Sequence, residues 1–236
     1  MPVTENLLRI EEKIQSACAR SRRNREEIRL MGVSKFHSRE AVEEAWQAGL
    51  RLFGENRVQE AVEKFTGFRE SHAGTELHLI GSLQRNKVKT AAPFFNCIQS
   101  VDRDSVIHEL GKTSGERGTA LELLLELHTG EESKSGFPGE ESLFRAVETA
   151  LSYPGLRIRG LMTMAPYTGS EGPIRNSFRR LVKVRDVLEA RFPPDTDKRC
   201  CWTCLSMGMS GDFEIAIEEG STLLRIGTGI FGERRQ

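Results

Sequence analysis

Eight short apolar runs recur along the chain, and a stretch with helical spacing separates each run from the next. The runs are residues 28–33, 50–53, 77–80, 97–101, 121–127, 156–162, 201–205 and 223–226. The first helix-like stretch begins after Ser38 and stops at Gly49. The others are residues 57–68, 84–91, 104–111, 141–151, 173–191 and 212–219. Strands that alternate with helices are typical of parallel β/α units.

This order of elements favours a single (β/α)8 barrel of the TIM type, with an open doubly wound sheet as the competing fold. Eight units within 236 residues match the usual length of one barrel. After Thr4, which we interpret as an N-cap, apolar residues at Leu7, Ile10 and Ile14 repeat with helical period and predict an extra N-terminal helix. No linker follows the eighth run, so we expect one domain over residues 1–236.

Charge and composition exclude several classes of protein. The 34 basic and 34 acidic residues cancel to a formal net charge of zero, so no electrostatic footprint for nucleic acid or an anionic membrane is visible. No apolar run approaches the roughly 20 residues that span a bilayer, and the N-terminus has no signal-peptide core. Five cysteines form an odd, scattered set that does not resemble a disulfide framework. We therefore expect a soluble cytoplasmic protein.

Two polar residues directly follow the first two predicted strands, at the end of a barrel where chemistry takes place. Ser34-Lys35 ends the first strand, and burial of Lys35 there would lower its pKa and supply the neutral amine that carbonyl chemistry needs. The alternative is a solvated surface lysine. Asn56 follows the second strand and can hydrogen-bond a ligand, or it can be a helix N-cap.

The turns after the seventh and eighth strands combine glycine with hydroxyl side chains. The first turn runs from Ser206 through Met207 to Ser210, and the second contains Gly227 and Thr228. Backbone N–H groups at such turns can hold an anion, and these two loops are where barrels commonly bind phosphate. Two ordinary glycine turns are the alternative.

Two charged residues beside these turns need separate interpretations. Arg225 precedes Gly227 by two residues, so strand alternation places both on one face and turns Arg225 inward. Its alternative role is an ion pair with an interior carboxylate. Asp212 would repel a phosphate, and we assign it to capping of the following helix, with its carboxylate turned away.

Two other features favour structural roles. His78 lies on the third strand, where a packed and satisfied histidine is expected. Cys201 and Cys204 have a Cys-x-x-Cys spacing, but on a strand they point to opposite faces, and no second cysteine pair or His-x3-His accompanies them. We expect packed thiols and no metal site.

Together these motifs resemble the pyridoxal phosphate homeostasis protein family, small barrel relatives of the alanine racemase N-terminal domain and similar to the fold type III proteins that use pyridoxal 5′-phosphate (PLP). The matching stretches run in order over nearly the whole chain. They are Val-Ser-Lys at 33–35, Phe-Gly-Glu-Asn-Arg-Val-Gln-Glu at 53–60, His-Leu-Ile-Gly-Ser-Leu-Gln-Arg-Asn-Lys at 78–87, Ser-Lys-Ser-Gly at 133–136, Gly-Leu-Met at 160–162, Leu-Ser-Met-Gly-Met-Ser at 205–210 and Arg-Ile-Gly-Thr-Gly-Ile-Phe-Gly at 225–232.

The resemblance implies a set of PLP-binding residues. Lys35 would hold PLP as an internal Schiff base, and Arg225 would face the pyridine nitrogen. The residues implied to hold the phosphate are Ser206, Ser210, Gly227 and Thr228, and those implied to lie near the cofactor are Asn56, Met164 and Met207. His37, close behind the lysine, and the cysteine cluster 200–204 depart from the family pattern without weakening it.

An arginine opposite the ring nitrogen favours a binding role. A guanidinium only donates hydrogen bonds, so it disfavours protonation of that nitrogen and makes the ring a weaker electron sink. Two-base racemisation also needs a group on the face opposite the lysine. In the racemase relatives a tyrosine from a second domain of a partner subunit supplies it, and we expect no such domain here. We therefore predict a carrier that stores or delivers PLP, with apo-enzymes that need PLP as recipients.

Two enzymatic alternatives remain open. One is a weak amino-acid racemase or related PLP enzyme that uses Lys35 with Tyr167 or a residue of loop 129–139. The other is a Schiff-base aldolase without cofactor, which needs a carboxylate base near Lys35 that the sequence does not show. The loops 129–139 and 163–172 are either mobile lids or solvated connections. The short chain favours a monomer.

Overall fold

The computed structural model describes residues 2–115, 119–130, 135–194 and 198–233. The strands are β1 (Arg29–Val33), β2 (Leu52–Glu55), β3 (Glu76–Leu79), β4 (Cys97–Val101), β5 (Leu121–Glu126), β6 (Leu156–Met162), β7 (Cys200–Ser206) and β8 (Leu223–Ile226). The helices are α1 (Val3–Ser21), α2 (Arg39–Gln47), α3 (Val58–Phe65), α4 (Phe68–Ser71), α5 (Val88–Phe94), α6 (Asp104–Ser114), α7 (Glu140–Leu151), α8 (Glu171–Arg191), α9 (Phe213–Glu218) and α10 (Thr228–Phe231), with 3-10 turns η1 (Arg25–Glu27) and η2 (Arg85–Lys87).

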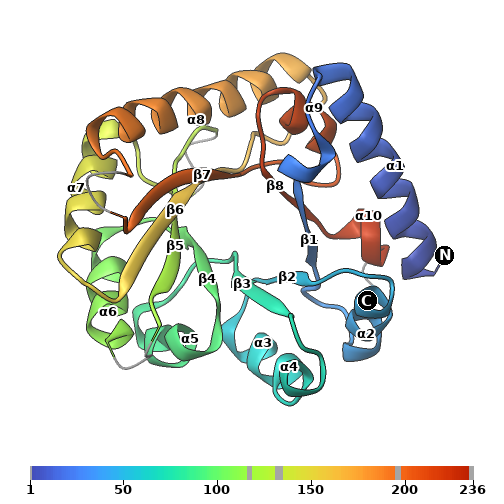
Figure 1. The fold of residues 1–236 in the computed structure, drawn as a ribbon, viewed down its shortest axis with the longest axis horizontal. Helices are drawn as coiled ribbons and strands as arrows, with labels where there is room; N and C mark the ends of the chain where they lie inside the picture. The colour runs from blue at the N-terminus through green and yellow to red at the C-terminus, as the bar shows by residue number, and fades with distance from the viewer. Residues whose placement is uncertain (1, 116–118, 131–134, 195–197, 234–236) are drawn as a thin grey trace.

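The eight strands form a closed parallel barrel in sequence order, with the helices arranged around it (Figure 1). Closure is made by β1 and β8, whose register pairs Arg29 with Leu223 and Gly32 with Ile226. This confirms the predicted (β/α)8 barrel, and the competing open sheet is wrong.

The core has an outer and an inner part. A large apolar cluster lies where helix residues pack against strand residues, and it includes Phe53, Phe178 and Trp202. Two smaller clusters contain strand residues only, one around Met31 and the other around Leu124. Side chains of successive strand residues point alternately to these two parts, so a position on the inner face near a strand's end faces the barrel mouth.

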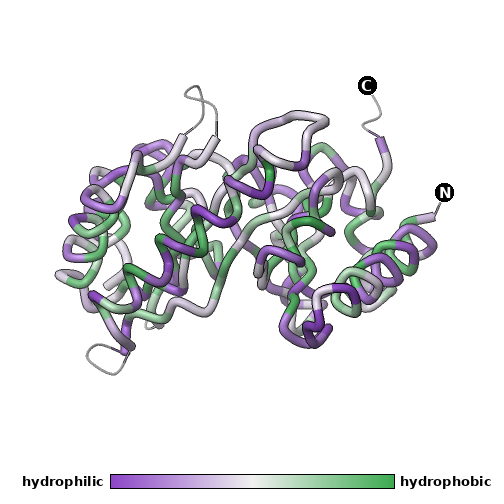
Figure 2. Tube along the Cα trace, turned by 90° about the horizontal axis from the view of Figure 1, so that it is seen from above, coloured by the Kyte–Doolittle hydropathy of each residue, from purple (hydrophilic) through white to green (hydrophobic). Residues whose placement is uncertain are grey.

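The extra N-terminal helix α1 is confirmed, and it packs against α9 and α10. Hydrophobic and hydrophilic residues alternate along it in Figure 2, as expected for a helix with one buried face. The predicted cap is wrong: α1 begins at Val3 with Pro2 at the N-cap position, and Thr4 lies inside the first turn. Proline has a fixed φ that suits the entry into a helix, so the helix starts earlier.

Most element boundaries lie close to the predicted ones. Ser38 caps α2 as expected, because its side chain accepts a hydrogen bond from the Ala41 N–H. The second strand begins two residues late, at Leu52, since the Leu50 N–H still bonds the Ala45 carbonyl and closes the end of α2. The short helix α10 was not predicted. No helix among the described residues is both long enough and apolar enough to cross a membrane.

Gly160 allows β6 and β7 to approach closely. Its φ is +149°, a backbone conformation that residues with a side chain rarely adopt, and a Cβ there would collide with the carbonyl oxygen of Cys204. Both residues lie where the register between the two strands shifts. The close approach of the two strands therefore depends on the absence of a side chain at Gly160.

We expect Gly160→Ala to lower the free energy of unfolding by at least about 1–3 kcal/mol, because the backbone must be strained or moved. Urea denaturation of both proteins measures the change. Gly169→Ala is the matched control, since a Cβ at Gly169 meets nothing within 4 Å. Equal stabilities of the two variants would contradict this interpretation.

Candidate functional site

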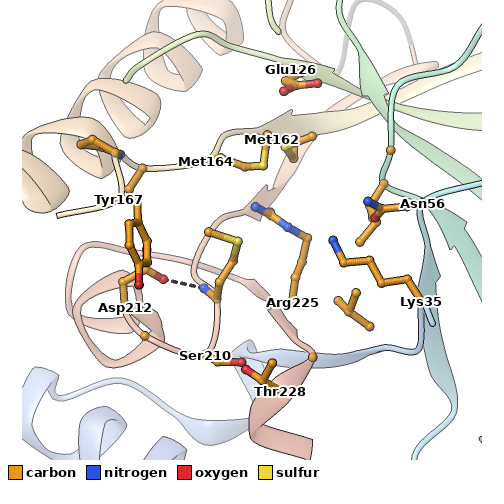
Figure 3. Close-up of a pocket in the computed structure, with 18 of the residues that line it drawn as sticks. Lys35, Asn56, Glu126, Met162, Met164, Tyr167, Ser210, Asp212, Arg225 and Thr228 are labelled. Carbon is orange, nitrogen blue, oxygen red and sulfur yellow. Dashed lines mark hydrogen bonds between the residues drawn. The ribbon is translucent and has the colours of Figure 1, made fainter. Parts of the chain in front are cut away.

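A cavity of about 670 Å³ opens at the carboxyl ends of the strands (Figure 3). This volume is typical of sites for small ligands. Seven of the predicted site residues line it: Lys35, Asn56, Met164, Ser210, Arg225, Gly227 and Thr228. The barrel thus brings together residues from both ends of the sequence, which is what the strand order predicts.

A tight turn at the end of β1 presents Lys35 to the cavity. The His37 N–H donates to the Ser34 carbonyl across the turn, at 3.0 Å. Phe36 has a φ of +65°, which is unusual for any residue other than glycine. In Figure 3 the half-buried side chain of Lys35 extends from β1 into the cavity, with its amine between Asn56 and Arg225. The surface-lysine alternative is therefore wrong.

A buried ion pair between Glu55 and Lys64 holds the turn that carries Lys35. Glu55 is fully buried at the end of β2, and its Oε1 accepts hydrogen bonds from Ser34 Oγ and Lys64 Nζ, each at 2.7 Å. Lys64 Nζ also donates to the Ser34 carbonyl, at 2.7 Å. Burial raises the pKa of the Glu55 carboxyl above its usual range, while the Lys64 charge opposes that shift. Ser34, the residue before Lys35, is thus fixed at both its side chain and its carbonyl.

Asn56 lies beside Lys35 at the cavity wall. The N-cap position of α3 is occupied by Arg57, so the alternative role of Asn56 as that helix's cap is wrong. A Cβ at Gly81 would collide with the Asn56 carbonyl oxygen, so the glycine lets the loop after β3 approach this residue closely.

Arg225 points inward, as strand alternation predicts. It is only 4% exposed, and its guanidinium reaches the middle of the cavity in Figure 3. Nη1 donates to Ser206 Oγ at 2.7 Å, and Nη2 donates to the Thr163 carbonyl at 2.8 Å. Within the described residues it forms no ion pair. Burial lowers the pKa of Arg225, and the charges of Asp212 and Glu126 oppose this shift. A guanidinium has five donors, so it can still bind a ligand.

The turns after β7 and β8 meet at the lower edge of the cavity. The Gly229 N–H donates to Ser210 Oγ at 3.2 Å, which ties the two turns together. Gly227 precedes α10, and Thr228 is its first residue. Asp212 lies at the N-cap position of α9 as predicted, but its carboxylate makes no cap bond and instead accepts the Met209 N–H at 2.5 Å. Asp212 lines the cavity, so the expectation that it turns away is wrong.

Two predicted site residues do not line the cavity. Ser206 is the last residue of β7 and is fully buried, where it contacts Arg225 and donates to Gln99 Oε1 at 2.6 Å. Met207 is fully buried in the main apolar cluster. The strand places Ser206 behind Arg225, away from the surface at which Ser210 and Thr228 meet.

The sequence interpretation missed several residues of the cavity wall. Glu126, the last residue of β5, is 2% exposed, and burial raises its pKa despite a hydrogen bond of 2.9 Å from Ser135 Oγ. Met162 and Met209 add thioether surface. Tyr167, which the racemase alternative already named, also lines the cavity and is 97% exposed. Glu126 lies one residue before the end of the predicted strand 121–127, so strand alternation could have found it.

The remaining candidates have structural roles. His78 is buried and bonded to Gln99, and His37 stacks on Phe231. Cys201 contacts Thr203, whereas Cys204 packs near Cys97 inside the barrel. Among the described residues no group of His, Cys, Asp and Glu is arranged to hold a metal ion. Residues 131–134 of the predicted loop 129–139, with Ser133 and Lys134 of the family motif, lie outside the described residues.

The fold and the cavity define an α/β barrel whose mouth presents a lysine, an arginine and two glycine-hydroxyl turns. The model of the family described as "Alanine racemase, N-terminal domain" matches residues 6–235. Pyridoxal phosphate homeostasis proteins of Aquifex aeolicus and Escherichia coli are 38% and 39% identical to this chain. The alignment covers 100% of both chains in the first case, and 98% of this chain and 97% of the relative in the second.

Solved structures are also similar to this chain. PipY of Synechococcus elongatus with PLP bound is 33% identical, with a TM-score of 0.81 over 94% of this chain and 100% of that chain. Alanine racemase of Clostridium difficile shares the fold at 13% identity and a TM-score of 0.76, over 100% of this chain and 57% of that chain. The chain belongs to the pyridoxal phosphate homeostasis protein family, within the wider family of alanine racemase N-terminal domains.

Removing Lys64 should destabilise the protein strongly, because Glu55 is then buried without its partner. We expect Lys64→Met to lower the free energy of unfolding by about 3–5 kcal/mol at pH 8. The double variant Glu55→Gln/Lys64→Met should recover part of this loss. Guanidinium denaturation of the parent protein, the single variant and the double variant provides the measurement. An unchanged stability of Lys64→Met would show that the ion pair does not contribute to the free energy of unfolding.

The same loss should depend on pH. Burial already raises the pKa of Glu55 in the folded parent protein, and Lys64→Met removes the charge that opposes this shift. Folding of the variant should therefore take up a proton, so that its stability falls more steeply than that of the parent as the pH rises above about 4.5. The deficit relative to the parent protein should therefore be smaller at pH 5 than at pH 8. A deficit independent of pH would contradict the assigned charge of Glu55.

Proposed function

We propose that this chain binds PLP in the cavity at the barrel mouth, with Lys35 as the residue that forms the Schiff base. The observation that carries the proposal is that Lys35, Arg225 and the turns containing Ser210, Gly227 and Thr228 line one cavity. An amine, a donor-only cation and a set of hydroxyl and backbone donors match the aldehyde, the ring nitrogen and the phosphate of PLP. PLP supplies an electrophilic aldehyde on an aromatic ring that can accept electrons.

Each residue has a separate part in this proposal. Lys35 condenses with the aldehyde through a C=N bond, with loss of one water. Arg225 donates to the ring nitrogen and keeps it unprotonated. Ser210, Gly227 and Thr228 hold the phosphate, while Asn56 and Met164 contact the ring. Ser206 acts through Arg225, since it is buried behind that side chain.

We propose a role in PLP homeostasis, in which the protein stores the cofactor or delivers it to apo-enzymes. Arg225 supports this role, because an unprotonated ring nitrogen weakens the electron sink that transamination needs. The sequence similarity to pyridoxal phosphate homeostasis proteins supports it as well. One domain over residues 1–236, a monomeric state and a cytoplasmic location remain parts of this proposal.

A weak racemase is the second candidate, and Glu126 is the observation that favours it. A buried carboxyl with a raised pKa in the same cavity can hold and release a proton, as a second acid or base must. Tyr167 is the other candidate for this group. The aldolase alternative requires a carboxylate base near Lys35, and Glu126 shares only the cavity with that lysine.

We expect the protein mixed with PLP to absorb visible light as a Schiff base, and Lys35→Ala to abolish that absorbance, because no other residue is proposed to supply the amine. Absorption spectra before and after dialysis provide the measurement. Lys183→Ala, on α8, is the control and should keep the parent spectrum. A Lys35→Ala spectrum like that of the parent would rule out Lys35.

For the carrier role we expect no amino-acid turnover near ordinary enzyme rates, whose median kcat is on the order of 10 s⁻¹. A screen of L-amino acids by chiral chromatography with the PLP-loaded protein makes the measurement. Racemisation at such rates would contradict the carrier role. Its loss in Glu126→Gln would then identify Glu126 as the second acid or base.

A further inference from the structure

A continuous chain of polar contacts runs from Arg225 through the interior of the barrel. Arg225 Nη1 donates to Ser206 Oγ at 2.7 Å, and Ser206 Oγ donates to Gln99 Oε1 at 2.6 Å. Gln99 Nε2 lies 2.8 Å from His78 Nδ1. His78 Nε2 lies 3.7 Å from Glu76 Oε2, a distance at which the contact is electrostatic. We call Ser206, Gln99 and His78 the relay.

The relay connects Arg225 at the cavity with Glu76 at the opposite end of the barrel. Its members come from β7, β4 and β3, while Arg225 lies on β8 at the cavity. Ser206 and Gln99 are fully buried, and His78 is 5% exposed. Glu76 is the first residue of β3, at the opposite end of the strands from the cavity, where it also pairs with Arg29 at 2.8 Å. Water therefore cannot replace a lost bond at the centre of the relay without a rearrangement.

The charges at the far end determine which nitrogen of His78 holds the proton. Burial lowers the pKa of His78, so the imidazole is neutral at neutral pH and carries one N–H. Contacts with His78 and Arg29 lower the pKa of Glu76 to about 2, so this carboxyl is ionised. Glu122 and Arg29 are the other charged groups that act on His78. An ionised Glu76 opposite Nε2 favours the proton there and leaves Nδ1 as an acceptor.

This tautomer fixes every other proton in the relay. Nδ1 accepts from the Gln99 amide, so the Gln99 oxygen faces Ser206 and accepts its hydroxyl proton. The Ser206 oxygen then has a lone pair free to accept from Arg225. If the Gln99 amide were reversed, its NH2 would face Ser206, and the Ser206 hydroxyl proton would lose its acceptor in the relay. The relay thus has one consistent arrangement, with every donor oriented from Arg225 toward Glu76.

We propose that Gln99 and His78 are positioning residues that keep the Ser206 oxygen as an acceptor and thereby hold the Arg225 guanidinium in the cavity. The proposal rests on the proposed PLP site, in which Arg225 donates to the ring nitrogen. The Thr163 carbonyl fixes Nη2, and the relay fixes Nη1. With both ends of the guanidinium held, its remaining donors have a defined direction toward the ligand.

Binding of pyridoxine 5′-phosphate tests the effect on Arg225, because this probe has the ring and the phosphate but no aldehyde. We expect Gln99→Leu and Ser206→Ala to raise its Kd about 10-fold, which corresponds to 1.4 kcal/mol. Lys35→Ala should change the Kd much less, since no covalent bond forms. Ser114→Ala is the matched control: its buried hydroxyl bonds the Gly111 carbonyl on α6, and its loss should leave the Kd unchanged.

Nitrogen NMR of His78 in the ligand-free protein tests the proton arrangement. We expect the Nε2–H tautomer in the parent protein. In Gln99→Glu the carboxylate still accepts from Ser206 but presents an acceptor to Nδ1, so His78 should become doubly protonated. Loss of packing alone would not change the charge of this imidazole.

The two measurements separate the possible failures. If the parent protein binds neither PLP nor pyridoxine 5′-phosphate, the proposed function is wrong, and the NMR result decides on the relay. If the parent protein binds both ligands, and the Ser206→Ala variant has the same Kd for pyridoxine 5′-phosphate as the Ser114→Ala control, the proposed relay is wrong. An Nδ1–H tautomer in the parent protein also overturns it. Should Gln99→Leu not fold, Ser206→Ala and Gln99→Glu decide.

Discussion

The pairing of β1 with β8 is the constraint on which the whole site depends. Only this contact brings Lys35, near the start of the chain, beside Arg225 and Gly227, near its end. Gly32 shows how closely the parts fit, because a Cβ there would lie 2.5 Å from a Leu50 methyl group. In an open sheet the same residues would lie at opposite edges. Barrel closure therefore creates the cavity as well as the fold.

Buried polar contacts then determine how the two main cavity residues are presented. The Glu55–Lys64 pair fixes Ser34 and so the turn that carries Lys35. Ser206 and the Thr163 carbonyl fix Arg225. Such groups are costly to bury unless they are paired, and here each of these contacts lies next to a cavity residue. These two sets of buried contacts thus orient the lysine and the arginine of the cavity.

The sequence predicts the strand order and most of the cavity because both follow from local patterns. Period-two alternation correctly turns Arg225 inward, and the position after a strand correctly places Lys35 and Asn56 at the mouth. Ser206 could not be placed in the same way. Whether a hydroxyl faces a ligand or a neighbouring side chain depends on contacts between strands far apart in the sequence, such as β4 with β7, and no local pattern encodes these.

The thioether surface of the cavity has a consequence for oxidative chemistry. Met162, Met164 and Met209 line the cavity, three of the six methionines of the chain. Met164 and Met209 are partly exposed, whereas Met162 is only 1% exposed. Oxidation to the sulfoxide would place a polar, branched group on an apolar wall. Peroxide would thus reach the binding surface before it reached most of the core, and reduction of the sulfoxide would restore that surface without any new protein synthesis.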